Sequence, residues 1–108
     1  MRAEELFRAD GAVLYCMDVG ELEDESTFYK YYETMSGERQ RKVDSLLRME
    51  DKRLSLGAGI LMDQGLSEWG LCEREAVLSY TEKGKPYLAQ HPHIHFNLSH
   101  SGSKVLAV

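Results

Sequence analysis

The sequence contains no long apolar run and few cysteines. None of its apolar stretches approaches the roughly 18 residues that a membrane-spanning helix requires, so we expect no membrane insertion. Its two cysteines, Cys16 and Cys72, lie far apart, and neither belongs to a CxxC pair. This spacing excludes a zinc knuckle and a redox pair, and it predicts two reduced thiols in the core.

The beginning of the chain also lacks the marks of a targeting segment. Residues 1–11, MRAEELFRADG, carry acidic residues and no apolar h-region, so we expect neither a secretory signal nor a transit peptide. The sequence shows no internal repeat, linker or low-complexity stretch. With 108 residues, 43% of them hydrophobic and 29% charged, the composition is that of one soluble globular domain, for which a cytoplasmic location is the default expectation.

Positive charge is scarce, and it is concentrated in one place. The net charge of −5 argues against a general nucleic-acid binder. Residues 1–35 carry three Lys or Arg against nine Asp or Glu, whereas residues 36–53 carry six against four. We call residues 36–53 the basic island; a local island of this kind suits a compact anion rather than a polyanion.

The hydrophobic pattern predicts a strand followed by helices. After an acidic leader, to which we assign no element, residues 11–19 alternate as a β-strand does, with Tyr15 and Met17 on the same side. Residues 21–35 then have helical spacing, with three candidate N-caps: Asp24, Ser26 and Thr27.

Two more helices are predicted within and after the basic island. Ser36 is the expected N-cap of the first, which would bury Val43, Leu46 and Leu47 and leave its basic residues on the helix surface. Residues 50–69 predict a second amphipathic helix that contains three glycines. Each glycine weakens the helix by about 1 kcal/mol relative to alanine, so close packing against a neighbour must compensate.

The remaining sequence predicts short strands. Residues 77–89 alternate around the turn-like cluster EKGKP, which indicates a hairpin. Residues 93–100 alternate again, and residues 103–108 form a further apolar strand that stops without a polar tail, as if the chain were cut. The order of strand, helices and several strands predicts an α+β domain over residues 1–108.

Three clusters of residues suit the binding of an anion, and each also has an ordinary structural interpretation. The first is the set of cations in the basic island, which would otherwise be a solvated helix face: Arg39, Arg41, Lys42, Arg48, Lys52 and Arg53. In the second, GKPY at residues 84–87, Pro86 favours an extended Lys85 and presents its ammonium at a rigid point; the alternative is a hairpin turn with a solubilising lysine.

The third cluster is FNLSHSG at residues 96–102. If residues 96–100 form a strand, Asn97 and Ser99 share one face and His100 lies on the other, and the turn after them lets backbone N–H groups approach a ligand. Such a strand end suits an anion. The alternative is a polar turn that closes a hairpin.

Two other chemistries are weaker candidates. His91, His93 and His95 alternate as zinc ligands on a strand do, but no cysteine or carboxylate lies nearby in sequence and Pro92 interrupts the run. The neighbouring serine and histidine at residues 99–100 suggest a serine hydrolase, yet the nucleophile elbow G-x-S-x-G is absent. We therefore expect neither a zinc site nor a hydrolase.

Taken together, GKPYL at residues 84–88, IHFNLSHSG at residues 94–102 and the apolar strand after them resemble the larger phosphopantetheinyl transferases, of the surfactin-synthetase-activating type. The segment MEDKRLSLGAGIL at residues 49–61 is similar to the arginine-containing helix that precedes the first motif in that family. The likeness extends from about residue 13 to residue 108.

The resemblance implies both a fold and an activity. Members of this family are built as two similar halves, and they transfer the phosphopantetheine arm of coenzyme A to a serine of a carrier protein. Residues 1–108 would then be the N-terminal half of the pseudo-dimeric fold, an antiparallel sheet packed with helices. The complete protein would convert acyl or peptidyl carrier proteins to the holo form and release 3′,5′-ADP.

The resemblance also implies roles for individual residues. Lys85 and Pro86 match the GKP motif, whose basic residue contacts a coenzyme A phosphate and whose proline shapes the nucleotide pocket. Ser99 and His100 match the SHS segment, whose histidine contacts the pyrophosphate region. The helix positions that hold the 3′-phosphate are matched by Arg53, Arg39 and Lys42.

The sequence departs from the family pattern at its end. The Mg²⁺ ligands of the family lie in an acidic GxDxE motif beyond the strand that follows SHS, and this sequence stops before that motif. We therefore expect the chain to hold part of a coenzyme A site and to be inactive alone, with Mg²⁺ bound by a C-terminal half. The alternative is a non-catalytic α+β module whose basic helix docks an acidic partner, such as a carrier-protein helix.

Overall fold

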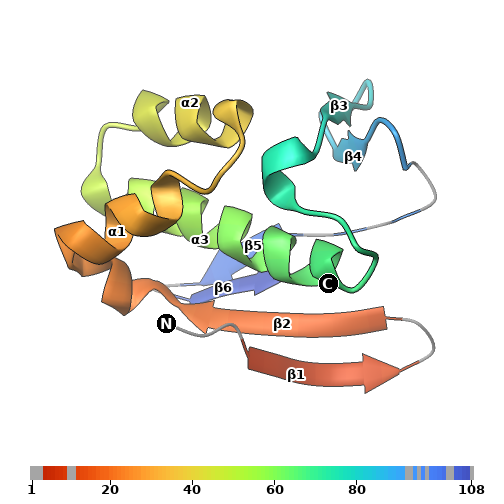
Figure 1. Ribbon diagram of the computed structural model, residues 1–108, viewed down its shortest axis with the longest axis horizontal. Coiled ribbons are helices and arrows are strands. Elements are labelled where there is room, and N and C mark those ends of the chain that lie inside the picture. The colour runs from red at the N-terminus through yellow and green to blue at the C-terminus, as the bar shows by residue number, and fades with distance from the viewer. Residues whose placement is uncertain are drawn as a thin grey trace.

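The structure is a computed structural model that describes residues 4–9, 12–91, 94, 96, 98–101 and 104–107, with side chains described at residues 5, 15–91, 94 and 96. In these parts of the chain, helices cover one face of an antiparallel sheet (Figure 1). The elements are β1 (Glu4–Ala9), β2 (Ala12–Asp18), η1 (Val19–Glu23), α1 (Glu25–Tyr32), α2 (Gly37–Ser45), α3 (Met49–Ser67), η2 (Glu73–Glu75), β3 (Leu78–Tyr80), β4 (Pro86–Leu88), β5 (Leu98–Ser101) and β6 (Lys104–Ala107). The predicted α+β fold, an antiparallel sheet packed with helices, is confirmed.

The main sheet has the strand order β1-β2-β6-β5, and every neighbouring pair is antiparallel. The strand predicted at residues 11–19 is confirmed as β2, and Tyr15 and Met17, which were placed on the same side of it, are both buried. The acidic leader, in contrast, forms β1, which pairs with β2 and has an irregularity between Glu5 and Phe7. Charged residues there hide the apolar alternation that would indicate a strand. The strand forms nevertheless, because the ladder with β2 supplies the backbone hydrogen bonds whatever the side chains are.

The helix starts follow the predicted caps. Asp24 caps α1: its Oδ2 accepts a hydrogen bond of 3.0 Å from the Thr27 N–H. Ser36 caps α2 through a bond of 3.1 Å from the Arg39 N–H to its Oγ. The third predicted helix is α3, which starts at Met49. Among the described residues, no helix is long and apolar enough to cross a membrane.

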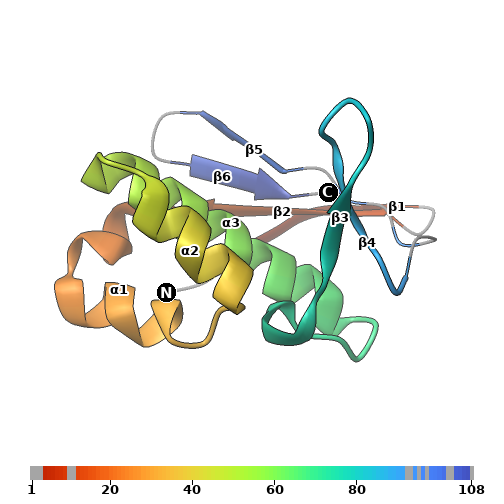
Figure 2. The ribbon, with the colours of Figure 1, turned by 90° about the horizontal axis from the view of Figure 1, so that it is seen from above.

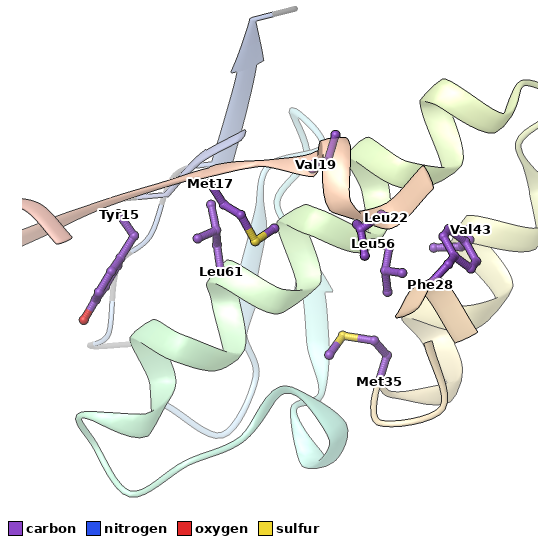
Figure 3. Packing of buried hydrophobic residues seen from close by; sticks show 9 residues of the cluster. All are labelled: Tyr15, Met17, Val19, Leu22, Phe28, Met35, Val43, Leu56 and Leu61. Atoms are coloured by element: carbon purple, nitrogen blue, oxygen red, sulfur yellow. The ribbon is translucent and has the colours of Figure 1, made fainter. Parts of the chain in front are cut away.

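The main core lies between α3 and the sheet and extends to α1 and α2 (Figure 3). Leu56 and Leu61 of α3 are fully buried, and Figure 3 shows Leu61 beside Met17 of β2 and Leu56 beside Val43 of α2. Complete burial of one such side chain contributes about 1.5–3 kcal/mol. Leu47, which we expected in the core, is 96% exposed because α2 ends at Ser45 and the backbone turns extended at the next residue.

A second cluster attaches the hairpin to the C-terminal half of α3. Met62 and Leu66 of α3 pack with Leu88 of β4 and with Ile94. The hairpin predicted around the EKGKP turn is confirmed as β3 and β4. Viewed from above, α2 lies over α3 on the side away from the sheet, and the hairpin stands at the other end of α3 (Figure 2). Both outer elements therefore use α3 as their support.

Candidate functional site

The hairpin presents Lys85 from a turn that hydrogen bonds hold in place. Gly84 has φ of +84°, a conformation that L side chains rarely adopt, and its N–H donates to the Thr81 carbonyl over 2.8 Å. The Lys85 N–H donates to Thr81 Oγ1 at 3.1 Å, and the Thr81 N–H donates back to the Lys85 carbonyl at 2.9 Å. The Lys85 side chain is exposed and Pro86 is half-buried. A solvent-facing ammonium thus stands on a well-defined backbone.

One side-chain hydrogen bond connects this hairpin to α2. Tyr80 is the strand partner of Pro86, and its hydroxyl donates to Glu38 Oε1 at 2.8 Å. The bond to the Glu38 carboxylate is the main cause of the raised pKa of Tyr80, because it favours the protonated phenol. The start of β4, which carries the GKP motif, therefore lies close to the first turn of α2.

Lys42 follows on the same side of α2, one helical turn beyond Glu38. Burial is the largest cause of a lowered pKa of Lys42; the charge of Arg39 lowers it further, and the Glu38 carboxylate partly offsets both. The ammonium is still exposed to solvent. A partly desolvated cation beside another cation gains from the arrival of an anion. The Tyr80–Glu38 bond joins α2, which carries Lys42, to the hairpin whose turn carries Lys85.

Arg39 is not on the helix surface, which corrects our expectation. It is 5% exposed, and its Nη1 lies 3.5 Å from both the carbonyl oxygen and Oγ of Ser55 on α3. Its Nε lies 3.9 Å from Glu73 Oε2 and, within the described residues, has no hydrogen-bond partner. The helical pattern cannot reveal this, since a buried acid from a distant segment draws the guanidinium inward.

Glu73 is a buried carboxylate that the sequence did not single out. Its carboxylate is 2% exposed and accepts two hydrogen bonds from Ser36, at 2.6 Å from the backbone N–H and at 2.8 Å from Oγ. The Glu73 N–H donates to Asp63 Oδ1 at 3.0 Å. The apolar neighbours in LCEREAVL are the one signal in the sequence, and they do not distinguish Glu73 from the exposed Glu75.

The cations Arg48, Lys52 and Arg53 of the basic island differ in their contacts. Lys52 has a structural role, because its Nζ donates to the carbonyl oxygens at the end of α2, at 3.1 Å for Val43. Arg48 forms an exposed ion pair with Glu50. Arg53 on α3 is half-buried, and within the described residues its side chain has no ion pair or hydrogen bond. Arg53 thus remains available to a ligand.

Ser99 and His100 lie in β5, at the edge of the main sheet. In the backbone register, His100 is paired with Val105 of β6, which is paired in turn with Met17 of β2, and Ser99 pairs with Leu106. The side chains of both residues, like Asn97 and Gly102, lie outside the described residues. The structure therefore places their strand and leaves their role as a prediction.

Metal ligands are not gathered in the part of the chain that the structure describes: it contains no group of three or more His, Cys, Asp or Glu that could hold an ion. His93 and His95 of the HxH pattern lie outside that part. These residues do not fit a Mg²⁺ centre of the kind that the family resemblance implies.

Comparisons with known proteins place this geometry in a family. A family model described as "4′-phosphopantetheinyl transferase, N-terminal" matches residues 23–108. No curated protein sequence matches the chain. Among solved structures, a holo-(acyl-carrier-protein) synthase from Bacillus anthracis str. Ames, in complex with coenzyme A (3′,5′-ADP), is similar in fold, with a TM-score of 0.60 and 14% identity over 87% of this chain and 88% of that one.

The family match covers α1, α2, α3, the hairpin, β5 and β6, so it includes every residue that we selected as a candidate ligand. The structural likeness, at low identity, supports the fold alone. From the match over most of its length, the chain belongs to the 4′-phosphopantetheinyl transferase family, as its N-terminal domain.

Proposed function

We propose that the complete protein transfers 4′-phosphopantetheine from coenzyme A to a serine of an acyl or peptidyl carrier protein, and that this chain supplies part of the coenzyme A site. The family match over residues 23–108 is the observation that carries the proposal. The holo-(acyl-carrier-protein) synthase of similar fold, whose structure is a complex with coenzyme A (3′,5′-ADP), supports it.

In this proposal the phosphates are held by cations from separate elements. Lys85 on the hairpin contacts one phosphate, and Lys42 and Arg53 on the helices contact the 3′-phosphate. Each charge-assisted contact contributes about 1.5–3 kcal/mol. The exposure of Lys42 and Lys85, and the absence of an ion pair for Lys85 and Arg53 within the described residues, support these roles.

Three further residues complete the proposed site. Pro86 shapes the nucleotide pocket beside Lys85, and Ser99 and His100 approach the pyrophosphate from β5. Arg39 is buried against Glu73, which favours a supporting role for it over direct contact with the 3′-phosphate.

In this proposal the reaction also depends on groups outside residues 1–108. The carrier serine Oγ forms a bond to the phosphorus next to the pantetheine, the pyrophosphate P–O bond breaks, and 3′,5′-ADP leaves while a base takes the hydroxyl proton. The described residues do not fit a Mg²⁺ site. We propose that the metal ligands and the base belong to a second, C-terminal half, as in the surfactin-synthetase-activating type, and that residues 1–108 bind and orient the nucleotide.

The test measures conversion of an apo carrier protein by the complete protein, with the holo product detected by mass spectrometry. We expect Lys85→Ala and His100→Ala each to raise the KM for coenzyme A by about ten-fold, the loss of one charge-assisted contact. Lys83→Ala is the matched control: it removes an exposed lysine from the same turn, outside the GKP motif, and should leave the KM unchanged.

Two outcomes would count against this function. If the KM for coenzyme A is the same in Lys85→Ala, His100→Ala and the wild type, the proposed phosphate contacts of Lys85 and His100 are wrong. Absence of coenzyme A binding in a calorimetric titration of the complete protein, together with binding of an acidic partner, would favour the non-catalytic interaction module instead.

A further inference from the structure

Glu73 is a buried carboxylate with no place among the proposed ligand contacts. It is 2% exposed, and a buried charge is tolerated only where hydrogen bonds or opposite charges satisfy it. Both of its oxygens are used by Ser36, and Oε2 also faces Arg39 Nε at 3.9 Å. All these partners belong to the first turn of α2 or to its cap.

The same contacts join α2 to two other elements. Glu73 lies in η2, and its backbone N–H is held by Asp63 of α3. Arg39 extends the network in the other direction, because its Nη1 approaches Ser55 on α3. The N-terminal end of α2 is thereby attached both to α3 and to the segment that leads into the hairpin.

This network affects the candidate site through the positions of two lysines. η2 ends three residues before β3 begins, and the hairpin returns to α2 through the Tyr80–Glu38 bond. Two attachments therefore determine how α2, which carries Lys42, lies relative to the hairpin, which carries Lys85. A nucleotide has its phosphates at separations that its covalent structure limits, so it can engage both lysines at once only if the two elements keep their spacing.

We infer that Glu73 is a positioning residue: through Ser36 and Arg39 it holds α2 so that Lys42 meets the 3′-phosphate while Lys85 holds another phosphate of the same coenzyme A. The inference rests on the proposed function. It gives Arg39 a role through Glu73, in keeping with its burial. Glu73 itself touches no ligand.

The experiment compares two ligands that differ in the 3′-phosphate alone. The Kd values of the complete protein for coenzyme A and for dephospho-coenzyme A are measured by calorimetry. The Kd for dephospho-coenzyme A divided by the Kd for coenzyme A reports the contribution of the 3′-phosphate. We expect Glu73→Gln to reduce this ratio by about ten-fold, because the 3′-phosphate loses a well-placed cation. A variant that is merely less stable would weaken both ligands alike and leave the ratio unchanged.

Met17→Ala is the control for general loosening. Met17 is 2% exposed on β2, on the sheet side of α3, and belongs to the main core (Figure 3). Its truncation should lower the melting temperature without changing the ratio of the two Kd values. Should Glu73→Gln fail to fold, Ser36→Ala is measured instead; it removes the Oγ hydrogen bond to the same carboxylate together with the cap of α2, and it should lower the ratio in the same direction.

The outcomes separate this inference from the proposed function. An unchanged ratio in a folded Glu73→Gln or Ser36→Ala variant would overturn the positioning role, and so would an equal fall in Met17→Ala. A wild type that binds coenzyme A but transfers nothing would overturn the proposed function, while the ratio would still decide the role of Glu73. A wild type without any preference for coenzyme A over dephospho-coenzyme A would overturn both.

Discussion

At the scale of single residues, two glycines of α3 look alike in the sequence and differ in their surroundings. A Cβ added at Gly59 would lie 2.7 Å from Met35 Sδ, closer than real Cβ atoms come, and 3.1 Å from Arg39 Cγ, tighter than most real Cβ contacts. A Cβ at Gly65 would meet Tyr15 Cε2 at 3.7 Å, an ordinary contact. The expected close packing of a neighbour against a glycine is thus confirmed at Gly59, where α2 crosses α3.

This difference predicts opposite effects of the same substitution. Gly59→Ala should lower the free energy of unfolding by about 1 kcal/mol, because overpacking against Met35 and Arg39 exceeds the gain in helix propensity. Gly65→Ala should raise it by about 0.5–1 kcal/mol, since the gain comes without a clash. Urea denaturation measures both. A stabilising Gly59→Ala would show that α2 does not press on α3 as the structure has it.

The burial of a side chain cannot be predicted from its neighbours in sequence where it depends on distant partners. Arg39 and Leu47 each violated the simple expectation that charged residues are outside and leucine inside. Arg39 is buried because Glu73, far along the chain, offers a buried negative charge, and Leu47 is exposed because the helix has already ended. Neither cause is visible within one helical turn of the residue.

At the scale of elements, the bond between Tyr80 and Glu38 is the polar link between hairpin and α2. Half of the Tyr80 side chain is exposed, so little surface is buried in this contact. The contact therefore depends more on the geometry of the hydrogen bond than on hydrophobic packing. The hydrogen bond exists while the phenol keeps its proton. Its strength must therefore depend on pH in the alkaline range.

The pKa of Tyr80 is raised above its ordinary value of 10.0, chiefly by the hydrogen bond to Glu38. A group whose pKa rises on folding stabilises the fold fully below its unfolded pKa, and this contribution is lost as the pH rises through the folded pKa. Subtracting the phenolate absorbance of Tyr80→Phe from that of the wild type isolates the absorbance of Tyr80. We expect the midpoint of this difference titration to lie above pH 10. Glu38→Gln should move that titration to lower pH.

Glu82→Gln is the matched control for this titration. It removes an exposed carboxylate from the hairpin turn that makes no described contact with Tyr80, so the midpoint should stay where it is in the wild type. A midpoint that moves equally in Glu38→Gln and Glu82→Gln would mean that general negative charge, and no specific bond, raises the pKa of Tyr80.

Most elements were predictable because their signals are local. The caps Asp24 and Ser36, the helical periodicity of α3 and the turn around Gly84 each depend on residues within a few positions of one another. β1 was not predictable in this way, since its strand character comes from pairing with β2 rather than from its own alternation.

At the scale of the whole molecule, a protein with a net charge of −5 has a local excess of cations over residues 36–53, where six Lys or Arg stand against four Asp or Glu. That distribution suits a compact anion such as coenzyme A, whose phosphates meet positive groups locally. Among the described residues there is no group of three or more His, Cys, Asp or Glu that could hold a metal ion.

We therefore expect the 108-residue chain alone to produce no holo carrier protein when given coenzyme A, Mg²⁺ and apo carrier protein, whereas the complete protein produces it. Mass spectrometry of the carrier measures the product, and circular dichroism shows whether the isolated chain is folded. Clear turnover by the folded 108-residue chain would refute the division of roles between two halves.

The sequence by itself determined the fold class, the helix caps, the hairpin and the family motifs GKP and SHS, because each depends on neighbouring residues or on a recognisable pattern. The tertiary structure alone decided that Arg39 turns inward, that Glu73 joins η2 to α2, and that Tyr80 joins the hairpin to Glu38 of α2. These contacts join residues tens of positions apart, and a buried charge or a hydrogen bond between distant side chains leaves no periodic trace in the order of amino acids.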